Sequence, residues 1–401
     1  MEHQEGVCRA MEEQKCAWPR GKALGGSTVI NYNIYTRGNP KDYDKWAEQG
    51  NDGWSYDEVL PYFLKSENCN LGIKLCSTRY HNNNGYLHVQ YPFKSEITEA
   101  FLEAGTQLGE KIVDYNTPDF MGFSQIQATL RNGRRHSTAD AFIYPVKDSR
   151  TNLKILTSAR VTKILIDPLN KQAYGVVFRR RGKQFIAKAR KEVILSAGAF
   201  GSPQLLMLSG IGPQEHLKQL NIPLVKNLPV GQLLYDHIGF LGLAFKINQT
   251  IEPREAIFDP REIFKWAFEG RGVFTSLGGV EALAYVNVGS IPDRNYPDTE
   301  LVFVGCEIHK FDSDDYWKCA LRSLSSTLHH QIGTCKMGLR SDSEAVVNSR
   351  LKVHDIEGLR VADSSIIPVT LSGHTSAPSI MIGEKASDII KKDWDVSKRY
   401  A

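Results

Sequence analysis

The sequence has few of the patterns that mark metal-binding or membrane-spanning chains. Its seven cysteines include no Cys-x-x-Cys pair, so no zinc site is expected. The polar first residues contain no apolar signal-peptide core. One uncharged stretch, residues 193–214, is long enough to span a bilayer, but glycine and proline interrupt it, so no transmembrane segment is expected. The cysteine spacing allows two local disulfides, Cys8–Cys16 and Cys69–Cys76.

The excess of positive over negative charge is also small. Lys and Arg number 49 against 45 Asp and Glu, a net charge of +4. The one dense basic run, residues 179–183, lies at an expected hairpin tip, so nucleic acid is not expected as a partner. A hydrophobic share of 41% and a charged share of 23% indicate a soluble globular protein of about two to three domains.

The dinucleotide fingerprint Gly-x-Gly-x-x-Gly occurs nowhere in the chain, which argues against a nicotinamide-dependent enzyme. Two segments nevertheless indicate an α/β fold. Residues 193–195 form an apolar strand of the buried type, followed by a helix with Ser202 as its N-cap, Pro203 as its first residue and an end at Gly210. Residues 359–362 form a second strand, followed by a hydroxyl-rich loop and a helix from about 377 to 392.

Periodicity predicts the remaining elements. Alternation indicates a strand at residues 86–91, and the spacing of apolar residues indicates a helix at 96–109. Further strands are expected at 153–156 and 161–166, and a hairpin at 174–189 turns at Arg181-Gly182.

A glycine pair at the start of the chain is the first candidate binding element. Gly25 and Gly26 allow a ligand to approach the backbone closely, and Ser27 with Thr28 offers hydroxyl and N–H groups. Asn31 follows. Taken alone, the same pair also suits an ordinary tight turn.

Two histidines are the candidate catalytic residues. His330 lies beside the glycine turn of residues 328–338, and His374 lies in the loop 372–375. Either imidazole can accept a proton near neutral pH, so the two are expected in one pocket. The alternatives are a structural histidine, as expected for His329, and a capped loop that only starts the following helix.

Four segments together resemble the glucose–methanol–choline (GMC) oxidoreductases, in the branch of the insect glucose dehydrogenases. Residues 18–27 match the first family signature and residues 201–213 the second. Residues 330–338 and 359–385 match the C-terminal catalytic region. The resemblance implies a mixed α/β (α+β) fold, with an FAD-binding domain and a substrate domain built on an antiparallel sheet. It also divides the chain into an FAD-binding region 1–240, a substrate-side region 241–310 and a C-terminal region 311–401.

The resemblance also assigns roles to residues. It implies FAD as the cofactor, bound near residues that match the family's positions, namely Gly25, Gly26, Ser27, Asn31, Val161, Asp363 and Ser364. Ile30 stands where some members carry a flavin-linked histidine, so the attachment is expected to be non-covalent. His330 matches the proton-accepting histidine, and His374 matches its polar partner.

The implied reaction is hydride transfer from a small alcohol to the flavin, with a quinone or oxygen as the later electron acceptor. The N-terminus of the helix near Ala377 would stabilise negative charge on the reduced ring. Full-length members of this branch are often secreted.

The sequence departs from the family in two places. Members begin with a strand, a Gly-x-Gly-x-x-Gly turn and a helix that hold the ADP half of FAD, whereas Met1 falls inside the family pattern. Near Lys310 the family has a longer intervening segment. The first βαβ unit is thus expected to be missing and FAD binding to be impaired. The alternative function is an inactive truncated homologue, or a binding protein without bound FAD.

Overall fold

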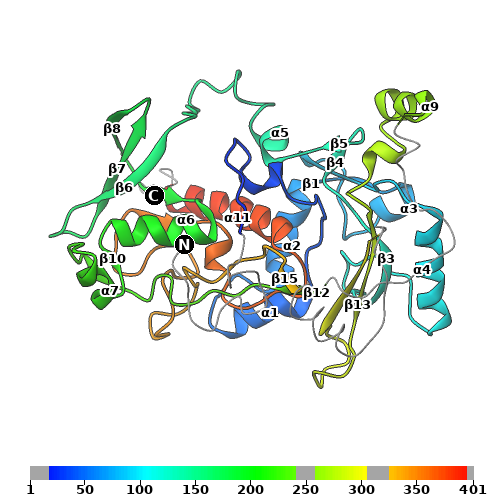
Figure 1. The fold of residues 1–401 in the computed structure, drawn as a ribbon. Helices are drawn as coiled ribbons and strands as arrows, with labels where there is room; N and C mark the ends of the chain where they lie inside the picture. Colours follow the sequence, from blue (N-terminus) through cyan, green and yellow to red (C-terminus); the bar gives the residue numbers. More distant parts are fainter. Residues whose placement is uncertain (1–17, 241–257, 305–324, 395–401) are drawn as a thin grey trace, which may run out of the picture. The chain divides into compact units, whose positions relative to one another are not determined.

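The computed structural model describes residues 18–240, 258–304 and 325–394 (Figure 1). The chain groups into two compact units, each built from three separate segments. Unit 1 contains residues 1–36, 68–145 and 236–330, and unit 2 contains residues 37–67, 146–235 and 331–401. The three contiguous regions expected from the sequence stay a prediction.

Among the described residues, unit 1 contains short strands and six helical segments of at least four residues. Its elements are η2 (Gly26–Val29), β1 (Glu67–Asn70, whose first residue belongs to unit 2), α3 (Ile73–Cys76), β2 (Leu87–Gln90), α4 (Glu96–Gln107), β3 (Gly122–Gln125), β4 (Leu130–Arg131), β5 (Arg134–Arg135), α5 (Thr138–Phe142), β12 (Ile238–Phe240), α9 (Pro260–Phe264), η3 (Lys265–Glu269), η4 (Val273–Thr275), β13 (Val280–Val286), β14 (Thr299–Val304) and β15 (Ser325–Thr327).

An antiparallel sheet of three strands, in the order β14-β13-β3, organises unit 1. Apolar residues of β13 are buried, and Leu283 and Tyr285 belong to a core cluster with Tyr115, Phe120 and Ile126. Strands β13 and β14 come from the region expected on the substrate side, but β3 comes from earlier in the chain; the sheet is antiparallel, as expected. The expected helix at 96–109 and strand at 86–91 form as α4 and β2.

The longest helix of the described residues, α11 (Ser376–Trp394), lies in unit 2. Its elements are α1 (Pro40–Glu48), α2 (Tyr56–Ser66), β6 (Arg160–Ile166), β7 (Ala173–Arg180), β8 (Lys183–Lys188), β9 (Val193–Leu195), α6 (Gly198–Leu208), β10 (Ile211–Gly212), α7 (Gln214–Gln219), β11 (Lys226–Asn227), β16 (Leu359–Val361), η5 (Ser364–Ile366) and α11 (Ser376–Trp394). None of the helices in the described part of the chain is both long and apolar enough to cross a membrane.

Two sheets of unit 2 follow the sequence closely. The hairpin β7–β8 turns at Arg181 and Gly182, both with positive φ, and β6 completes a three-stranded antiparallel sheet. Strand β9 pairs in parallel with β16, in the register Leu359↔Val193. Each of these two strands feeds a turn and then a helical segment, which confirms the α/β character expected for this part of the chain.

The helix after β9 begins earlier than predicted. Helix α6 starts at Gly198, so Ser202 is not its N-cap and Pro203 lies inside it. A proline inside a helix frees the carbonyl four residues earlier, here that of Ala199. The hydroxyl of Thr334 donates a 2.6 Å hydrogen bond to this carbonyl. A residue 135 positions from Ala199 thus supplies the missing donor, which the local sequence could not show.

Replacing Thr334 by Val is expected to lower the free energy of unfolding by about 1–3 kcal/mol, because the buried Ala199 carbonyl loses its hydroxyl donor while the side-chain shape is kept. Denaturant unfolding measures the change. The control is Thr162→Val on β6, where the hydroxyl makes a 3.4 Å contact with the Val177 carbonyl at a partly exposed site. Equal losses for the two variants would contradict the assigned role of Thr334.

Two strand predictions need correction. Residues 153–156 form no strand, because no other described segment pairs with them, and Leu153 and Leu156 are 37% and 44% exposed. Strand β9 was expected to be buried on both faces. Val193 and Leu195 are buried, but Ile194 between them is 44% exposed. Among the described residues, β9 has a strand on one edge only.

Candidate active site

The predicted glycine pair forms an exposed, open turn in unit 1. Gly25 and Gly26 both have positive φ, 98° and 58°, and Gly26 begins the short helix η2. A Cβ atom added at Gly26 would meet no atom within 4 Å, and Gly26 and Ser27 are both exposed. The backbone of Gly26 and Ser27 is therefore accessible, whereas an added Cβ at Gly25 would lie 3.2 Å from Ala139; contact of this turn with a ligand stays a prediction.

Three side chains hold this turn in place, and of these only Thr28 was singled out from the sequence. The hydroxyls of Thr28 and Thr138 donate to the carbonyl of Gly25 at 2.6 and 3.0 Å. The guanidinium of Arg135 donates to the Asn31 carbonyl at 2.6 Å and to the Asn31 Oδ1 atom at 2.9 Å. Burial lowers the pKa of Arg135 from its ordinary value. The only signal in the sequence was the capping pattern Ser137-x-x-Asp140, which starts α5 beside the turn.

His330 lies at the end of the segment that follows β15 in unit 1. Its backbone N–H donates to Oδ1 of Asp236 at 2.8 Å, and the other carboxylate oxygen accepts from the hydroxyl of Thr327. The Trp18 indole donates to that same hydroxyl at 3.2 Å. The ring nitrogen Nδ1 of His330 lies 2.9 Å from Nδ1 of His237. Neither Asp236 nor His237 was predicted as a site residue.

His374 lies in a loop of unit 2 that a buried carboxylate organises. Oδ2 of Asp42 accepts from the backbone N–H of Ser372 at 3.0 Å and from its hydroxyl at 2.7 Å. The same oxygen accepts from the N–H of Asn39, which caps helix α1. His374 itself is half-buried. Because His330 belongs to unit 1 and His374 to unit 2, their common pocket stays a prediction.

Asp363, at the end of β16, directs its carboxylate to protein donors. Oδ2 accepts from the N–H of Gly198 at 2.9 Å and from the hydroxyl of Ser202, and Oδ1 accepts from the N–H of Ser365 at 2.8 Å. The buried carboxylate therefore joins the start of α6 to η5, the short helix that contains Ser364. This is a structural contribution to the loop, and direct cofactor contact by Asp363 stays a prediction.

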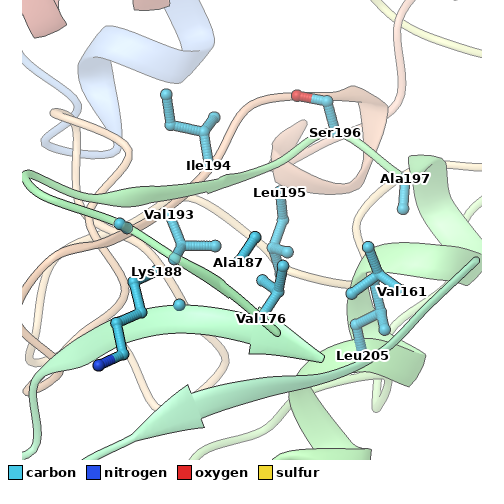
Figure 2. A pocket seen from close by; sticks show the side chains of 12 residues that line it. Val161, Val176, Ala187, Lys188, Val193, Ile194, Leu195, Ser196, Ala197 and Leu205 are labelled. Carbon is cyan, nitrogen blue, oxygen red and sulfur yellow. The ribbon is translucent and has the colours of Figure 1, made fainter. Parts of the chain in front are cut away.

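A pocket of about 440 Å³ in unit 2 is lined in part by Val161, which matches the position whose backbone holds the adenine of FAD in the family that the sequence resembles. Val161 of β6, Leu195 of β9 and Leu205 of α6 line it together with Ser196 and Lys188 (Figure 2). The walls are mostly aliphatic, and a hydroxyl and an ammonium group are the polar additions. Such walls suit a planar aromatic ring with polar edges.

Other histidines of unit 1 are less suited to accept a proton. His81 contacts Asp114 at 2.7 Å inside the protein. Burial would raise the pKa of Asp114, but hydrogen bonds from His81, Asn116 and Gln127 lower it overall. The ring of His136 lies 5.2 Å from that of His88, and burial lowers the pKa of His136 to about 4. No group of three metal-ligating side chains occurs in the part of the chain that the structure describes.

Stability should depend on pH through His136. Its pKa is about 4 in the native protein against 6.5 ordinarily, because the ring is buried, and its Nδ1 atom accepts from the backbone N–H of His88. As pH falls from 6.5 toward 4, the unfolded chain takes up a proton that the native ring excludes. The free energy of unfolding should thus fall by about 1–3 kcal/mol across this window. His136→Asn keeps a hydrogen-bond acceptor, so it should flatten this pH dependence and leave the free energy of unfolding above pH 7 unchanged. A variant whose stability depends on pH as steeply as the wild type would contradict the role of His136.

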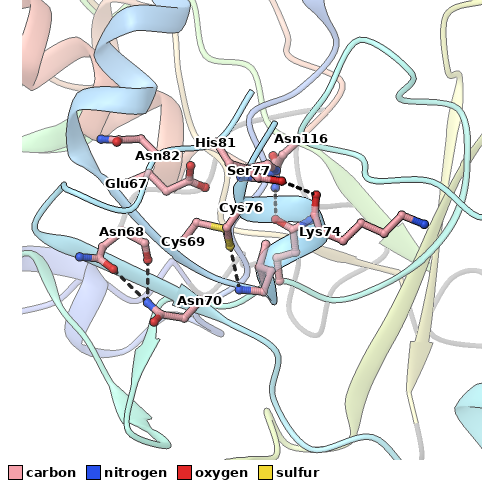
Figure 3. Close-up of a disulfide and its surroundings, with 12 residues drawn as sticks. Glu67, Asn68, Cys69, Asn70, Lys74, Cys76, Ser77, His81, Asn82 and Asn116 are labelled. Carbon is pink, nitrogen blue, oxygen red and sulfur yellow. Dashed lines mark hydrogen bonds between the residues drawn. A yellow bond between two sulfur atoms is a disulfide. The ribbon is translucent and has the colours of Figure 1, made fainter. Parts of the chain in front are cut away.

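A disulfide joins Cys69 and Cys76 in unit 1 (Figure 3). It confirms one of the two expected local pairings, while Cys8 and Cys16 lie outside the described residues. Cys335 is a free, buried thiol, and burial raises its pKa well above the ordinary range. It is therefore not suited to act as a nucleophile.

The residues present fit parts of an FAD molecule within each unit. In unit 1, the open turn at Gly26 offers backbone N–H groups to a polar ligand. In unit 2, the pocket at Val161 offers aliphatic walls to an aromatic ring, and the Gly198 turn is likewise open, since an added Cβ would meet nothing within 4 Å. These observations fit FAD, and direct contact of the cofactor with Gly25, Gly26, Ser27, Asn31 and Val161 stays a prediction.

Sequence profiles of a known family match both ends of the chain. The N-terminal profile described as GMC oxidoreductase matches residues 2–239, and the C-terminal profile matches residues 293–383. All predicted site residues lie inside these two ranges.

Individual proteins are similar over nearly the whole chain. The protein named glucose dehydrogenase [FAD, quinone] of Drosophila melanogaster is 35% identical, covering 97% of this chain and 77% of its own length. Human mitochondrial choline dehydrogenase is 33% identical, covering 97% of this chain and 79% of its own. The first alignment spans 482 positions against 401 residues here, so that relative has residues within the aligned region that this chain lacks.

A solved structure shows the same fold. An FAD-dependent oxidoreductase from Chaetomium thermophilum superposes with a TM-score of 0.79 at 23% identity, covering 93% of this chain and 86% of that chain.

Proposed function

Because this chain belongs to the GMC oxidoreductase family, a family of FAD oxidoreductases, we propose that it oxidises the CH–OH group of a small alcohol with His330 as general base. The observation that carries the proposal is the placement of His330. Its backbone is tied to Asp236, its Nδ1 atom contacts His237, and its ring is half-buried. A ring held in this way can present its other nitrogen, Nε2, to a substrate hydroxyl.

The chain's own residues supply proton transfer and positioning. His330 would accept the hydroxyl proton at Nε2, and His374 would hold the hydroxyl oxygen by a hydrogen bond. When bound, FAD supplies a hydride acceptor for the alcohol carbon. The turn of Gly25, Gly26 and Ser27 would contact its flavin side, and Val161 its adenine side. Asn31 and Ser364 complete the proposed contacts.

The substrate class is a sugar or another small alcohol, because the two relatives are named for glucose and choline. A quinone is the favoured electron acceptor, because the name of the Drosophila relative includes quinone, and oxygen is the alternative. Non-covalent attachment follows from Ile30 at the position of the flavin-linked histidine. Secretion is the proposed location, which the Cys69–Cys76 disulfide supports because disulfides persist in oxidising compartments.

A second candidate function is a family member with little bound FAD. It is supported by the absence of Gly-x-Gly-x-x-Gly from the 401 residues and by the free edge of β9 among the described residues. Charge-assisted hydrogen bonds to a pyrophosphate contribute about 1.5–3 kcal/mol each. Without two or three of them, affinity for FAD would fall by several orders of magnitude.

Flavin binding by residues 1–401 separates the two candidates. The purified chain is incubated with FAD and desalted, and the bound flavin is measured by absorbance. Near-stoichiometric flavin that an alcohol bleaches without oxygen supports the enzyme, whereas a colourless protein supports the second candidate. Stoichiometric flavin that no sugar, choline or simple alcohol bleaches would contradict the proposed reaction.

A further inference from the structure

The side chain of His237 makes a direct contact with the proposed base. Its Nδ1 atom lies 2.9 Å from Nδ1 of His330. The two rings are nearly perpendicular, at 88°, with centroids 5.2 Å apart. Both side chains are half-buried in unit 1. The distance is that of a hydrogen bond, so one proton lies between the two ring nitrogens.

A contact between two Nδ1 atoms requires one proton between them. In a neutral imidazole one ring nitrogen carries the proton and the other accepts. If His237 donates, neutral His330 carries its own proton on Nε2 and cannot accept another there. If His330 donates, its Nε2 is a free acceptor, and His237 carries its proton on its own Nε2. Only the second arrangement leaves His330 competent as a base.

The backbone around the pair prevents the two rings from drifting apart. His237 precedes β12, and Thr327 ends β15, the strand that pairs with β12 in the register Ile238↔Thr327. The N–H of Leu328 donates to the His237 carbonyl at 3.0 Å. Asp236 adds its bond to the N–H of His330 on the same side. The contact between the rings is thus built by two strands joined at several points.

We propose that His237 is a positioning residue, which accepts a hydrogen bond from Nδ1 of His330 and thereby keeps Nε2 of His330 unprotonated, so that this nitrogen can take the substrate proton. The proposal rests on the proposed function of His330. It assigns to a neutral histidine the part that a carboxylate plays in a Ser-His-Asp triad, where the third member fixes the tautomer of the base.

The proton balance follows from this arrangement. The substrate O–H bond breaks and its proton forms a bond to Nε2 of His330, which becomes an imidazolium. Its Nδ1–H stays in the hydrogen bond to neutral His237, and this bond strengthens because the donor is now charged.

The tautomer of His330 can be measured without catalysis and without FAD. The chain contains 11 histidines, and labelling them with ¹⁵N gives side-chain spectra in which protonated and bare ring nitrogens differ in shift. His330→Gln identifies the signals of His330 by their loss. We expect His330 to be protonated on Nδ1 and bare on Nε2 in the neutral protein. A predominant Nε2–H form would overturn the proposal from the wild-type spectrum alone.

Two substitutions test the cause. His237→Asn keeps an acceptor oxygen near the place of Nδ1, whereas His237→Leu removes it at similar volume. In the leucine variant, His330 is expected to become a mixture of both tautomers, and flavin reduction by an alcohol should slow about 10–100-fold with KM changed less than about threefold. The asparagine variant should restore the tautomer and most of the rate. Thermal unfolding shows whether either variant has lost its fold.

The outcomes separate this proposal from the function it rests on. An unchanged His330 tautomer in folded His237→Leu, or an asparagine variant as impaired as the leucine one, would overturn the role of His237. If His237 sets the tautomer but His330→Gln leaves the rate of flavin reduction unchanged, the positioning role stands and the proposed base fails.

Discussion

Replacing His330 by Gln is expected to lower the rate of flavin reduction by an alcohol about 10²–10⁴-fold per bound flavin, which is the range for loss of a general base. Glutamine retains hydrogen-bonding capacity but has no group that accepts a proton near neutral pH. Stopped-flow absorbance without oxygen measures the step, and the flavin content of each preparation corrects for altered cofactor binding.

The neighbouring histidine provides a matched control. His329 is exposed and has a positive φ of 62°, a conformation that asparagine tolerates well, so His329→Asn should fold and reduce flavin at nearly the wild-type rate. A His330→Gln rate within about threefold of wild type would remove His330 as the base. An equal loss in both variants would point to the integrity of the segment instead of proton transfer.

Breaking the buried ion pair of Arg37 and Glu67 in unit 2 should give the largest loss of stability. The guanidinium lies 3.0 Å from the carboxylate, and the side chains are 1% and 0% exposed. The Arg37 guanidinium also lies 5.6 Å from the centre of the Phe63 ring. Arg37→Met removes the positive charge beside a desolvated carboxylate, so the free energy of unfolding is expected to fall by about 3–5 kcal/mol.

A more exposed ion pair in the same unit is the control. Lys65 contacts Glu384 at 2.7 Å, but its side chain is 44% exposed, so Lys65→Met should cost at most about 1 kcal/mol. The double variant Arg37→Met with Glu67→Leu should recover part of the stability lost by Arg37→Met, because no buried charge is left. A loss for Arg37→Met as small as that for Lys65→Met would show that Arg37 does not neutralise a buried charge.

Elements with a strong local pattern could be predicted from the sequence. The hairpin at Arg181-Gly182 needs two residues with positive φ, and the structure has them there. Helix α4 follows from apolar spacing, and β9 with β16 follows from short apolar runs before turns. The four family motifs likewise identified the GMC family, because they are long and contiguous in the chain.

The candidate site depended on partners far away in the sequence. His237 lies 93 positions from His330, and Asp42 lies 330 positions from Ser372. Neither pair has a local pattern, and Arg135 reaches Asn31 over 104 positions. The sequence therefore predicted the histidines and the glycine turn as site residues but not the side chains that hold them.

By itself, the sequence determined the family and the order of the main strands and helices, because these depend on contiguous residues and their spacing; which residue types carry the chemistry stays a prediction. The tertiary structure decided where a hydrogen-bond donor or a neighbouring strand was available. Helix α6 begins at Gly198 because Thr334 supplies a donor to the carbonyl that Pro203 leaves free. Residues 153–156, with three apolar side chains of four, form no strand, because no described segment pairs with them to complete the hydrogen bonds.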